Sequence, residues 1–337
     1  MGDSYPRIRL AAAQAASVFL DREASVAKAC DLIREAGAGG ADVVGFPEGF
    51  IPAHPVWTHF HSGVSPRAMA WNKDLFRNAV EVPSPATEAL GQAAREANVN
   101  VVISVCEKES GQMGTMYNSL LFFDRRGRLI GRHRKLVPTQ GERMVHTGGF
   151  GDSLHALPTD FGRLSGLACG ENSNPLAVYA LIARGTNVHV CSWPPHFNPG
   201  PDMASIVLIA SRALAYQAKA FVINAVGVVS DEMRRILPLT DADRAFLDRV
   251  HDGSSIIGPY GQILAGPMGR GEGILYAEAD LNDIIGPKIV QDFAGHYNRA
   301  DILQLHINSA VPPRLVADAQ PVAPHWQPIA PEPPKQE

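Results

Sequence analysis

The sequence has little net charge, few cysteines and no long hydrophobic run. Its 337 residues carry 30 Lys and Arg against 34 Asp and Glu, a formal net charge of −4. No basic excess therefore exists to neutralise a phosphate backbone. The longest apolar runs, such as residues 99–106, are less than half of the ~20 residues that a membrane-spanning helix needs. We expect neither a nucleic-acid partner nor a membrane partner.

The four cysteines lie at positions 30, 106, 169 and 191, without any C-x-x-C spacing. This scatter argues against a disulfide framework and against a zinc ribbon. A reducing, cytoplasmic location is therefore expected. With 45% hydrophobic and 19% charged residues, the chain also lacks the composition of a disordered protein and has the material for a large core.

Strand and helix patterns alternate along the chain. Apolar runs and alternation predict strands over residues 8–15, 42–46, 99–106, 118–123, 129–133, 164–168, 188–191, 221–226, 254–257, 262–265 and 273–279, with a further strand pair around 160–163. Helical periodicity with start and stop residues predicts helices from residue 21 to about 37 and over 85–98, 175–184 and 203–219. Strands that alternate with helices indicate sheets covered by helices.

No linker-like composition separates the two halves of the chain. We therefore predict one domain over residues 1–310. Residues 311–337 contain repeated prolines and few core-forming residues. Because proline-rich sequence favours an extended and solvated backbone, this segment is expected to be an extended or disordered tail.

Cys169 is the first candidate for chemistry. It stands in the string RLSGLACGENSNPL, where an apolar strand leads directly into Cys-Gly and a helix begins near Pro175. Such a turn puts a nucleophile at the carboxyl end of a sheet, and a nearby helix N-terminus favours the thiolate. The alternative is a buried and inert cysteine, which is a common state of free thiols.

Two further strings end strands with polar residues. Glu48 follows the strand 42–46 in VVGFPEGFIP, and a carboxylate among apolar neighbours tends to keep its proton, as a general base near neutral pH does. In GRHRKLVPTQGERMVHTGG, Lys135 is the basic residue most easily drawn inward, because apolar Leu136 follows it; an inward lysine can stabilise an oxyanion. Taken singly, these strings are better explained by a surface glutamate and a solvated basic run.

The strings FPE, HRKL with ERMV, and CGENSNPL follow one another in this order along the chain, and each stands at a predicted strand end. With them the chain resembles the nitrilase branch of the carbon–nitrogen hydrolase (nitrilase) superfamily, and DFAGHYNRADIL at residues 292–303 is similar to nitrilases as well. The resemblance covers most of the chain. It implies a four-layer α-β-β-α sandwich, although the alternation of elements alone would also allow an α/β barrel. It further implies a homo-oligomer, at least a dimer, with spiral assembly as an extension of it.

The resemblance also implies roles for four residues. Cys169 would be the nucleophile and Glu48 the general base. Lys135 would stabilise charge, and Glu142 would be a second carboxylate that positions the substrate or the lysine. Such a thiol adds to a nitrile to form a thioimidate, from which water releases ammonia and then the carboxylic acid. This chemistry requires no cofactor.

The same Glu-Lys-Cys set serves other branches of the superfamily. An amidase that hydrolyses a small carboxamide is therefore the main alternative to a nitrilase of organic nitriles, and a cyanide-hydrolysing member is another. A non-enzymatic protein on the same scaffold would be expected to have lost at least one of the four residues. The chain has all four.

Four residues are candidates for substrate binding: His54, Trp57, Gly170 and Trp193. Gly170 stands where many nitrilases have tryptophan, and His54 replaces the tyrosine of a GYP string. A roomy, partly aromatic pocket favours an organic nitrile over cyanide, because each buried CH₂ contributes about 0.8 kcal/mol and aromatic walls can contact an aryl group. The sequence does not decide between an aliphatic nitrile and an arylacetonitrile as the substrate.

Three histidines, at positions 54, 59 and 61, occur close together. On a strand, His59 and His61 would point the same way and could share a metal ion. No acidic residue or cysteine accompanies them nearby. We therefore predict no metal site.

Overall fold

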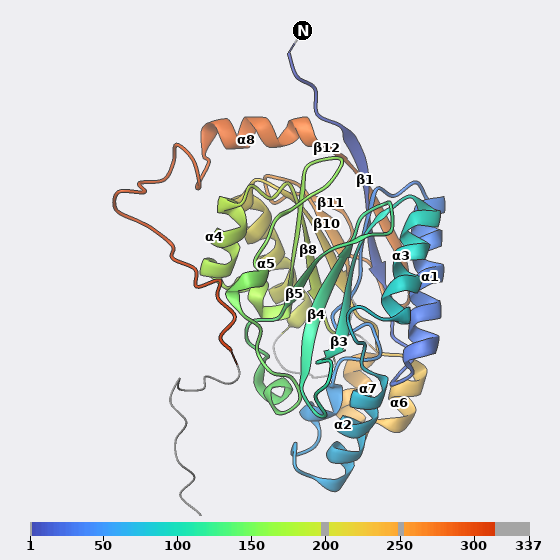
Figure 1. Ribbon diagram of the computed structural model, residues 1–337. Coiled ribbons are helices and arrows are strands. Elements are labelled where there is room, and N and C mark those ends of the chain that lie inside the picture. The colour runs from blue at the N-terminus through green and yellow to red at the C-terminus, as the bar shows by residue number, and fades with distance from the viewer. Residues whose placement is uncertain (1, 197–201, 249–252, 314–337) are drawn as a thin grey trace, which may run out of the picture.

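The computed structural model describes residues 2–196, 202–248 and 253–313, and in it two six-stranded sheets lie between helices (Figure 1). The order in the first sheet is β12 (Gly273–Asp280), β1 (Arg7–Gln14), β2 (Val43–Gly45), β3 (Asn100–Lys108), β4 (Met116–Phe123) and β5 (Leu129–Arg134). The order in the second is β11 (Ile263–Ala265), β10 (Ser255–Ile257), β9 (Phe221–Val226), β8 (Val188–Trp193), β7 (Arg163–Ala168) and β6 (Leu157–Pro158). Neither sheet closes into a barrel, so the predicted sandwich is confirmed.

Helices cover the outer face of each sheet. Figure 1 shows α1 (Arg22–Ala38) and α3 (Pro85–Ala97) on one side and α4 (Pro175–Ala183) and α5 (Met203–Ala218) on the other. α1 begins where the Asp21 side chain accepts a hydrogen bond from the Ala24 N–H at 2.9 Å, a normal N-cap. The remaining helices are α2 (Pro66–Asn78), α6 (Asp231–Ile236), α7 (Asp241–Leu247) and α8 (Ile285–Val290).

The apolar core follows these layers because successive residues of a strand face opposite sides of the sheet. On β1, Leu10 belongs to the cluster between the two sheets, whereas Ala11 belongs to the cluster that packs under α1 and α3. The sheets approach closely: a Cβ added to Gly45 would lie 2.7 Å from Val190 Cγ1. A third cluster fills the space between the second sheet and α4 and α5.

The structure corrects some details of the sequence prediction. α2 was not predicted, and His59 ends a short 3-10 helix, η1 (Val56–His59), where a strand had been considered. His59 and His61 therefore do not share a strand face. Most of the predicted tail, residues 314–337, lies outside the described residues, and the tail and the domain boundary stay predictions. Within the described part of the chain, no helix combines the length and apolarity that crossing a membrane requires.

Candidate active site

The candidate residues converge because they follow strands that end close together. Glu48 follows β2, Lys135 follows β5 and Cys169 follows β7. β2 is parallel to β3, and the two antiparallel pairings from β3 through β4 make β5 run in the direction of β2. The carboxyl ends of β2 and β5 therefore lie at the same end of the first sheet, as is typical of sites in α/β proteins. β7 belongs to the second sheet, and its parallel neighbour β8 ends beside Glu48, whose N–H donates to the Trp193 carbonyl.

A buried lysine shared by two carboxylates forms the centre of the site. Lys135 Nζ donates to Glu48 Oε1 at 2.7 Å and to Glu142 Oε2 at 2.6 Å, and all three side chains are buried. Asn118, on β4, donates from Nδ2 to Glu48 Oε1 at 2.5 Å and to Glu142 Oε1 at 2.8 Å. The Thr139 N–H adds a bond to Glu142 Oε2 at 2.9 Å. Buried charges persist when they are paired and hydrogen-bonded in this way.

The two carboxylates differ in their tendency to hold a proton. Burial raises the pKa of Glu48 to about 7, and the negative charge of Glu142 adds to the rise. Burial also opposes the ionisation of Glu142, but its hydrogen bond with His146 and the charge of Lys135 outweigh burial and lower its pKa. Burial acts against the Lys135 charge too, yet the surrounding negative groups raise its pKa. Glu48 is thus the carboxylate that exchanges a proton near neutral pH.

One oxygen of Glu48 is free to accept that proton. Oε1 holds the bonds from Lys135 and Asn118, whereas Oε2 is buried and has no hydrogen-bond partner among the described residues. A buried, unpaired carboxylate oxygen is unfavourable. Its cost is understandable where the oxygen serves as a proton acceptor.

Cys169 lies at the predicted strand-to-helix elbow. It follows β7, has the positive φ of 51° that such a sharp turn requires, and begins a short 3-10 helix, η4 (Cys169–Ser173), ahead of α4. Its electrostatic neighbours include Glu48 and Lys135. The expectation of a thiolate is wrong for this structure: burial and the Glu48 charge raise the pKa of the thiol to about 12. The resting group is a thiol, so it needs a base.

Glu171 was missed by the sequence analysis, although it stands in the quoted CGENS string. Its Oε1 accepts from the Leu136 N–H at 2.6 Å, and its Oε2 accepts from the Ala168 N–H at 3.2 Å and lies 3.1 Å from His133 Nε2. Leu136 follows the candidate lysine and Ala168 precedes the candidate cysteine. Glu171 therefore ties the two strand ends together.

The four substrate-binding candidates have different surroundings. His54 is buried, and burial lowers its pKa to about 3, so a neutral imidazole faces the charges of Glu142 and Lys135. A Cβ at Gly170 would meet nothing closer than Thr139 Oγ1, 3.9 Å away, so the space beside the cysteine is open.

The two tryptophans are fully buried. Trp57 packs against Phe19 and Trp71, and its indole N–H donates to Asn72 Oδ1 at 2.9 Å, which are the contacts of a core residue. Trp193, at the end of β8, accepts the Glu48 N–H on its carbonyl at 3.1 Å. Its indole nitrogen has no hydrogen-bond partner in the described part of the chain. Contact of either residue with substrate stays a prediction.

A set of possible metal ligands falls within the same site. Glu48, His54 and Glu142 each offer one ligand atom, and these atoms lie within 4.8 Å of one another. The ammonium of Lys135, however, already bonds to both carboxylates. The residues therefore fit an internal ion pair better than a metal ion.

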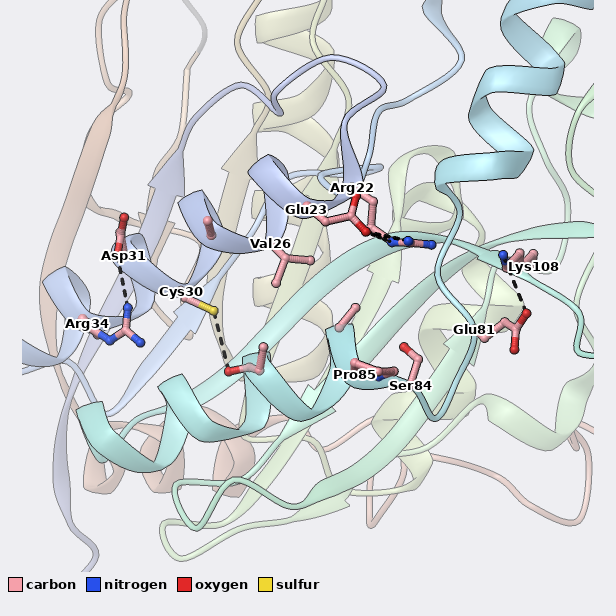
Figure 2. A pocket seen from close by; sticks show the side chains of 13 residues that line it. Arg22, Glu23, Val26, Cys30, Asp31, Arg34, Glu81, Ser84, Pro85 and Lys108 are labelled. Carbon is pink, nitrogen blue, oxygen red and sulfur yellow. Dashed lines mark hydrogen bonds and ion pairs between the residues drawn. The ribbon is translucent and has the colours of Figure 1, made fainter.

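A separate hollow of about 760 Å³ lies on the outer surface between α1 and α3 (Figure 2). Val26 and Cys30 contribute to its wall, and the ion pair of Lys108 with Glu81 stands on its rim. None of the candidate catalytic side chains lines it. It does not belong to the site described above.

Comparisons with known proteins identify the family and the fold of the chain. Residues 9–286 match the family described as carbon-nitrogen hydrolase. A protein named nitrilase 2, from an unknown prokaryotic organism, is 39% identical over 94% of this chain and 97% of its own length. A nitrilase from Bacillus sp. strain OxB-1 is 36% identical over 90% of this chain and 88% of its own length. The crystal structure of a carbon-nitrogen hydrolase from Helicobacter pylori G27 has a TM-score of 0.67 at 19% identity, over 88% of this chain and 97% of that one.

Proposed function

The chain belongs to the carbon–nitrogen hydrolase family, in its nitrilase branch, and from this premise we propose that it hydrolyses organic nitriles to the carboxylic acid and ammonia. One observation carries the chemical part of the proposal. Glu48 keeps one buried oxygen free while Lys135 and Asn118 hold the other. The charge of this carboxylate acts on the Cys169 thiol. Covalent catalysis requires a nucleophile and a nearby base that can take its proton, and Cys169 and Glu48 would fill these two roles.

The first half of the reaction forms a covalent intermediate. Glu48 accepts the thiol proton as the Cys169 sulfur attacks the nitrile carbon, and a carbon–sulfur bond replaces one carbon–nitrogen π bond. The proton then passes from Glu48 to the nitrogen. The product is a thioimidate. Because the resting thiol has a raised pKa, attack without the base would be slow.

The second half of the reaction consumes two waters. The first water adds to the thioimidate carbon, and both of its protons pass in turn through Glu48 to the nitrogen, the first on addition and the second as the carbon–nitrogen bond breaks. Ammonia then leaves, and the carbon keeps the water oxygen as the carbonyl of a thioester. The resulting thioester is hydrolysed by the second water, which releases the acid and restores the thiol. Lys135 would stabilise the oxyanion of each tetrahedral intermediate. Glu142 would hold the lysine in place through the 2.6 Å contact.

The pocket residues support organic substrates. The open space at Gly170 leaves room for a substituent next to the reacting carbon. Because His54 is neutral, it can offer or accept a hydrogen bond without adding charge. We propose His54 and Gly170 as contacts of the substrate, and Trp57 and Trp193 as residues that shape the aromatic side of the pocket from its wall.

The test is ammonia release from matched substrates. Phenylacetonitrile, an aliphatic nitrile, cyanide and the two corresponding amides are assayed under one condition with the native chain and with Cys169→Ala. Release from the organic nitriles by the native chain alone supports the proposal. Faster release from the amides than from the nitriles would indicate an amidase, and a preference for cyanide would refute the pocket interpretation.

We also propose that the chain assembles at least as a dimer in the cytoplasm. The outer surface of α4 and α5 carries large apolar side chains in contact with solvent: Leu176, Ile206, Ile209 and Tyr216. Such a patch is typical of a protein–protein contact, and a second copy of this chain is the proposed occupant. The cysteines are free in the structure, as expected in a reducing compartment. Sedimentation at micromolar concentration tests the assembly, and a monomer alone would refute it.

A further inference from the structure

A series of hydrogen bonds connects the candidate site to a second cysteine, which the proposed mechanism does not use. His146 Nδ1 lies 3.1 Å from Glu142 Oε1, and His146 Nε2 lies 3.2 Å from Cys106 Sγ. All three side chains are buried. His146 follows the short 3-10 helix η2 (Gln140–Met144), and Cys106 comes from β3. The series therefore joins the segment that carries Glu142 to the first sheet through His146.

The chemistry of the partners decides the direction of the bond between His146 and Glu142. An ionised carboxylate can only accept hydrogen bonds, so His146 must donate from Nδ1 to Glu142. Burial and the charge of Glu142 raise the pKa of the Cys106 thiol, so this group is protonated, and its sulfur has Met116 Sδ at 3.7 Å and His146 Nε2 at 3.2 Å as hydrogen-bond partners. The series then consists of a thiol, an imidazole that donates from Nδ1, and a carboxylate.

We propose that His146 is a positioning residue of the active site: by donating to Glu142 it fixes the negative charge there and leaves the exchangeable proton to Glu48. A donor to the charged form of an acid favours that form. The two carboxylates share Asn118 and Lys135 as donors. Two donors bond to Glu142 and not to Glu48: the Thr139 backbone N–H and, among the side chains, His146. This asymmetry separates their roles, as in other sites where two neighbouring carboxylates act differently.

Other charged and titratable groups surround Glu142 and His146, and each could affect where the proton resides. They come from several elements: Lys135 after β5, Glu48 after β2, His54 in the following loop, Cys169 at the elbow, Cys106 on β3 and, beyond it, Glu107. None of them replaces the bond that His146 makes. Without that bond, the state with both carboxylates ionised is less stable. The site should then take up its proton at a higher pH.

The experiment compares two variants of similar size. His146→Asn keeps an N–H close to the place of Nδ1, whereas His146→Leu removes the donor. The first readout is kcat and KM for ammonia release against pH, which rests on the proposed function. The second is the rate at which iodoacetamide alkylates Cys169 against pH, measured by mass spectrometry of its peptide, and it needs no nitrile. Thermal unfolding controls for the fold.

For His146→Leu we expect kcat to fall at least about tenfold, with KM within about threefold, and the acid limb of both pH profiles to move up by about one unit. His146→Asn should keep the limb at the native pH. The proposal is overturned if the limb of His146→Leu stays at its native position, or if both variants move it equally. A purely structural histidine would lower the yield or melting temperature without moving the limb.

A third variant covers a failure of His146→Leu to fold. His146 lines an open hollow of about 650 Å³ together with Met144 and Thr147, so imidazole from solution can reach the space left in His146→Ala. Restoration of the native limb by imidazole supports the proposal, and its failure overturns it. If the native chain releases no ammonia from any substrate, the proposed function fails, while the alkylation profile still decides the role of His146.

Discussion

Replacement of Lys135 by methionine would test whether one buried ammonium keeps two carboxylates charged. The variant keeps most of the side-chain volume and removes the charge. With contacts of 2.7 and 2.6 Å and an effective dielectric constant of about 20, each pair is worth ~6 kcal/mol of Coulomb energy. The ammonium's own desolvation penalty, several kcal/mol, offsets much of this. We therefore expect a loss of about 3–5 kcal/mol at alkaline pH, as for other broken buried pairs.

The loss should depend on pH in a defined direction. Without the ammonium, the pKa of both carboxyls in the folded protein rises above the value in the unfolded chain. The folded state then binds more protons than the unfolded state, so stability falls as pH rises. Between about pH 4.3, the ordinary value of a glutamate, and the raised pKa, the variant should lose stability progressively. It should be much closer to the native chain at pH 5 than at pH 8.

The assay is urea unfolding of both proteins at pH 5 and pH 8, at one protein concentration because assembly would contribute to stability. Lys135→Arg keeps the charge, so its loss should be nearly independent of pH. Lys108→Met removes a lysine of the rim pair with Glu81, 3.6 Å apart, and should cost at most about 1 kcal/mol. Ammonia release by Lys135→Met should fall at least about a hundredfold. An equal stability loss at both pH values, or activity within tenfold of native, would refute the reasoning.

Three further predictions concern the neighbours of this lysine. The kcat/KM of the native chain should decline as pH falls through about 7, because burial raises the pKa of Glu48 to about 7 and only its ionised form accepts the thiol proton; a profile flat from pH 5 to 8 would contradict this. Cys169→Ala should release no ammonia while its circular dichroism and melting temperature stay native, and detectable turnover would exclude it as nucleophile. Glu171→Ala should lower kcat and destabilise the fold by about 1–3 kcal/mol, since the Leu136 and Ala168 N–H groups lose their acceptor; an unchanged kcat would show that it does not position the site.

The fold could be predicted where the local pattern agrees with the final packing. The strand predicted over residues 221–226 coincides with β9, Phe221–Val226, whose residues are all buried. α2 was missed although Ala68 and Leu75 are buried on it and Trp71 and Phe76 pack against the same cluster, which is the apolar spacing of a helix. Its start residues, Ser65 and Pro66, form an N-cap and a first helical position. Those two residues and the apolar spacing that follows them were the available sequence clues.

The candidate site could be predicted from its strand ends but not from its contacts. Glu48 and Lys135 are 87 residues apart, and their 2.7 Å contact depends on the strand pairing that puts the carboxyl ends of β2 and β5 at the same end of the first sheet. Asn118 had no local pattern that distinguished it from other polar residues of a strand. The thiol's raised pKa also depends on tertiary burial, which the helix N-terminus alone did not reveal. The sequence identified single candidate residues, whereas the contacts between them and the resulting pKa shifts depend on the fold.

The charge balance of the site explains why these couplings matter for catalysis. Glu48, Glu142 and Lys135 together carry one net negative charge when both carboxylates are ionised, and the buried His54 is neutral. A buried site is more stable without net charge, which favours a proton on Glu48. In the proposed mechanism, transfer of the thiol proton to this carboxylate leaves a neutral Lys135–Glu142 pair and moves the excess negative charge to the Cys169 sulfur. The same burial that makes the free thiol a weak acid therefore also makes Glu48 a stronger base, and attack on the substrate carbon disperses the charge that remains.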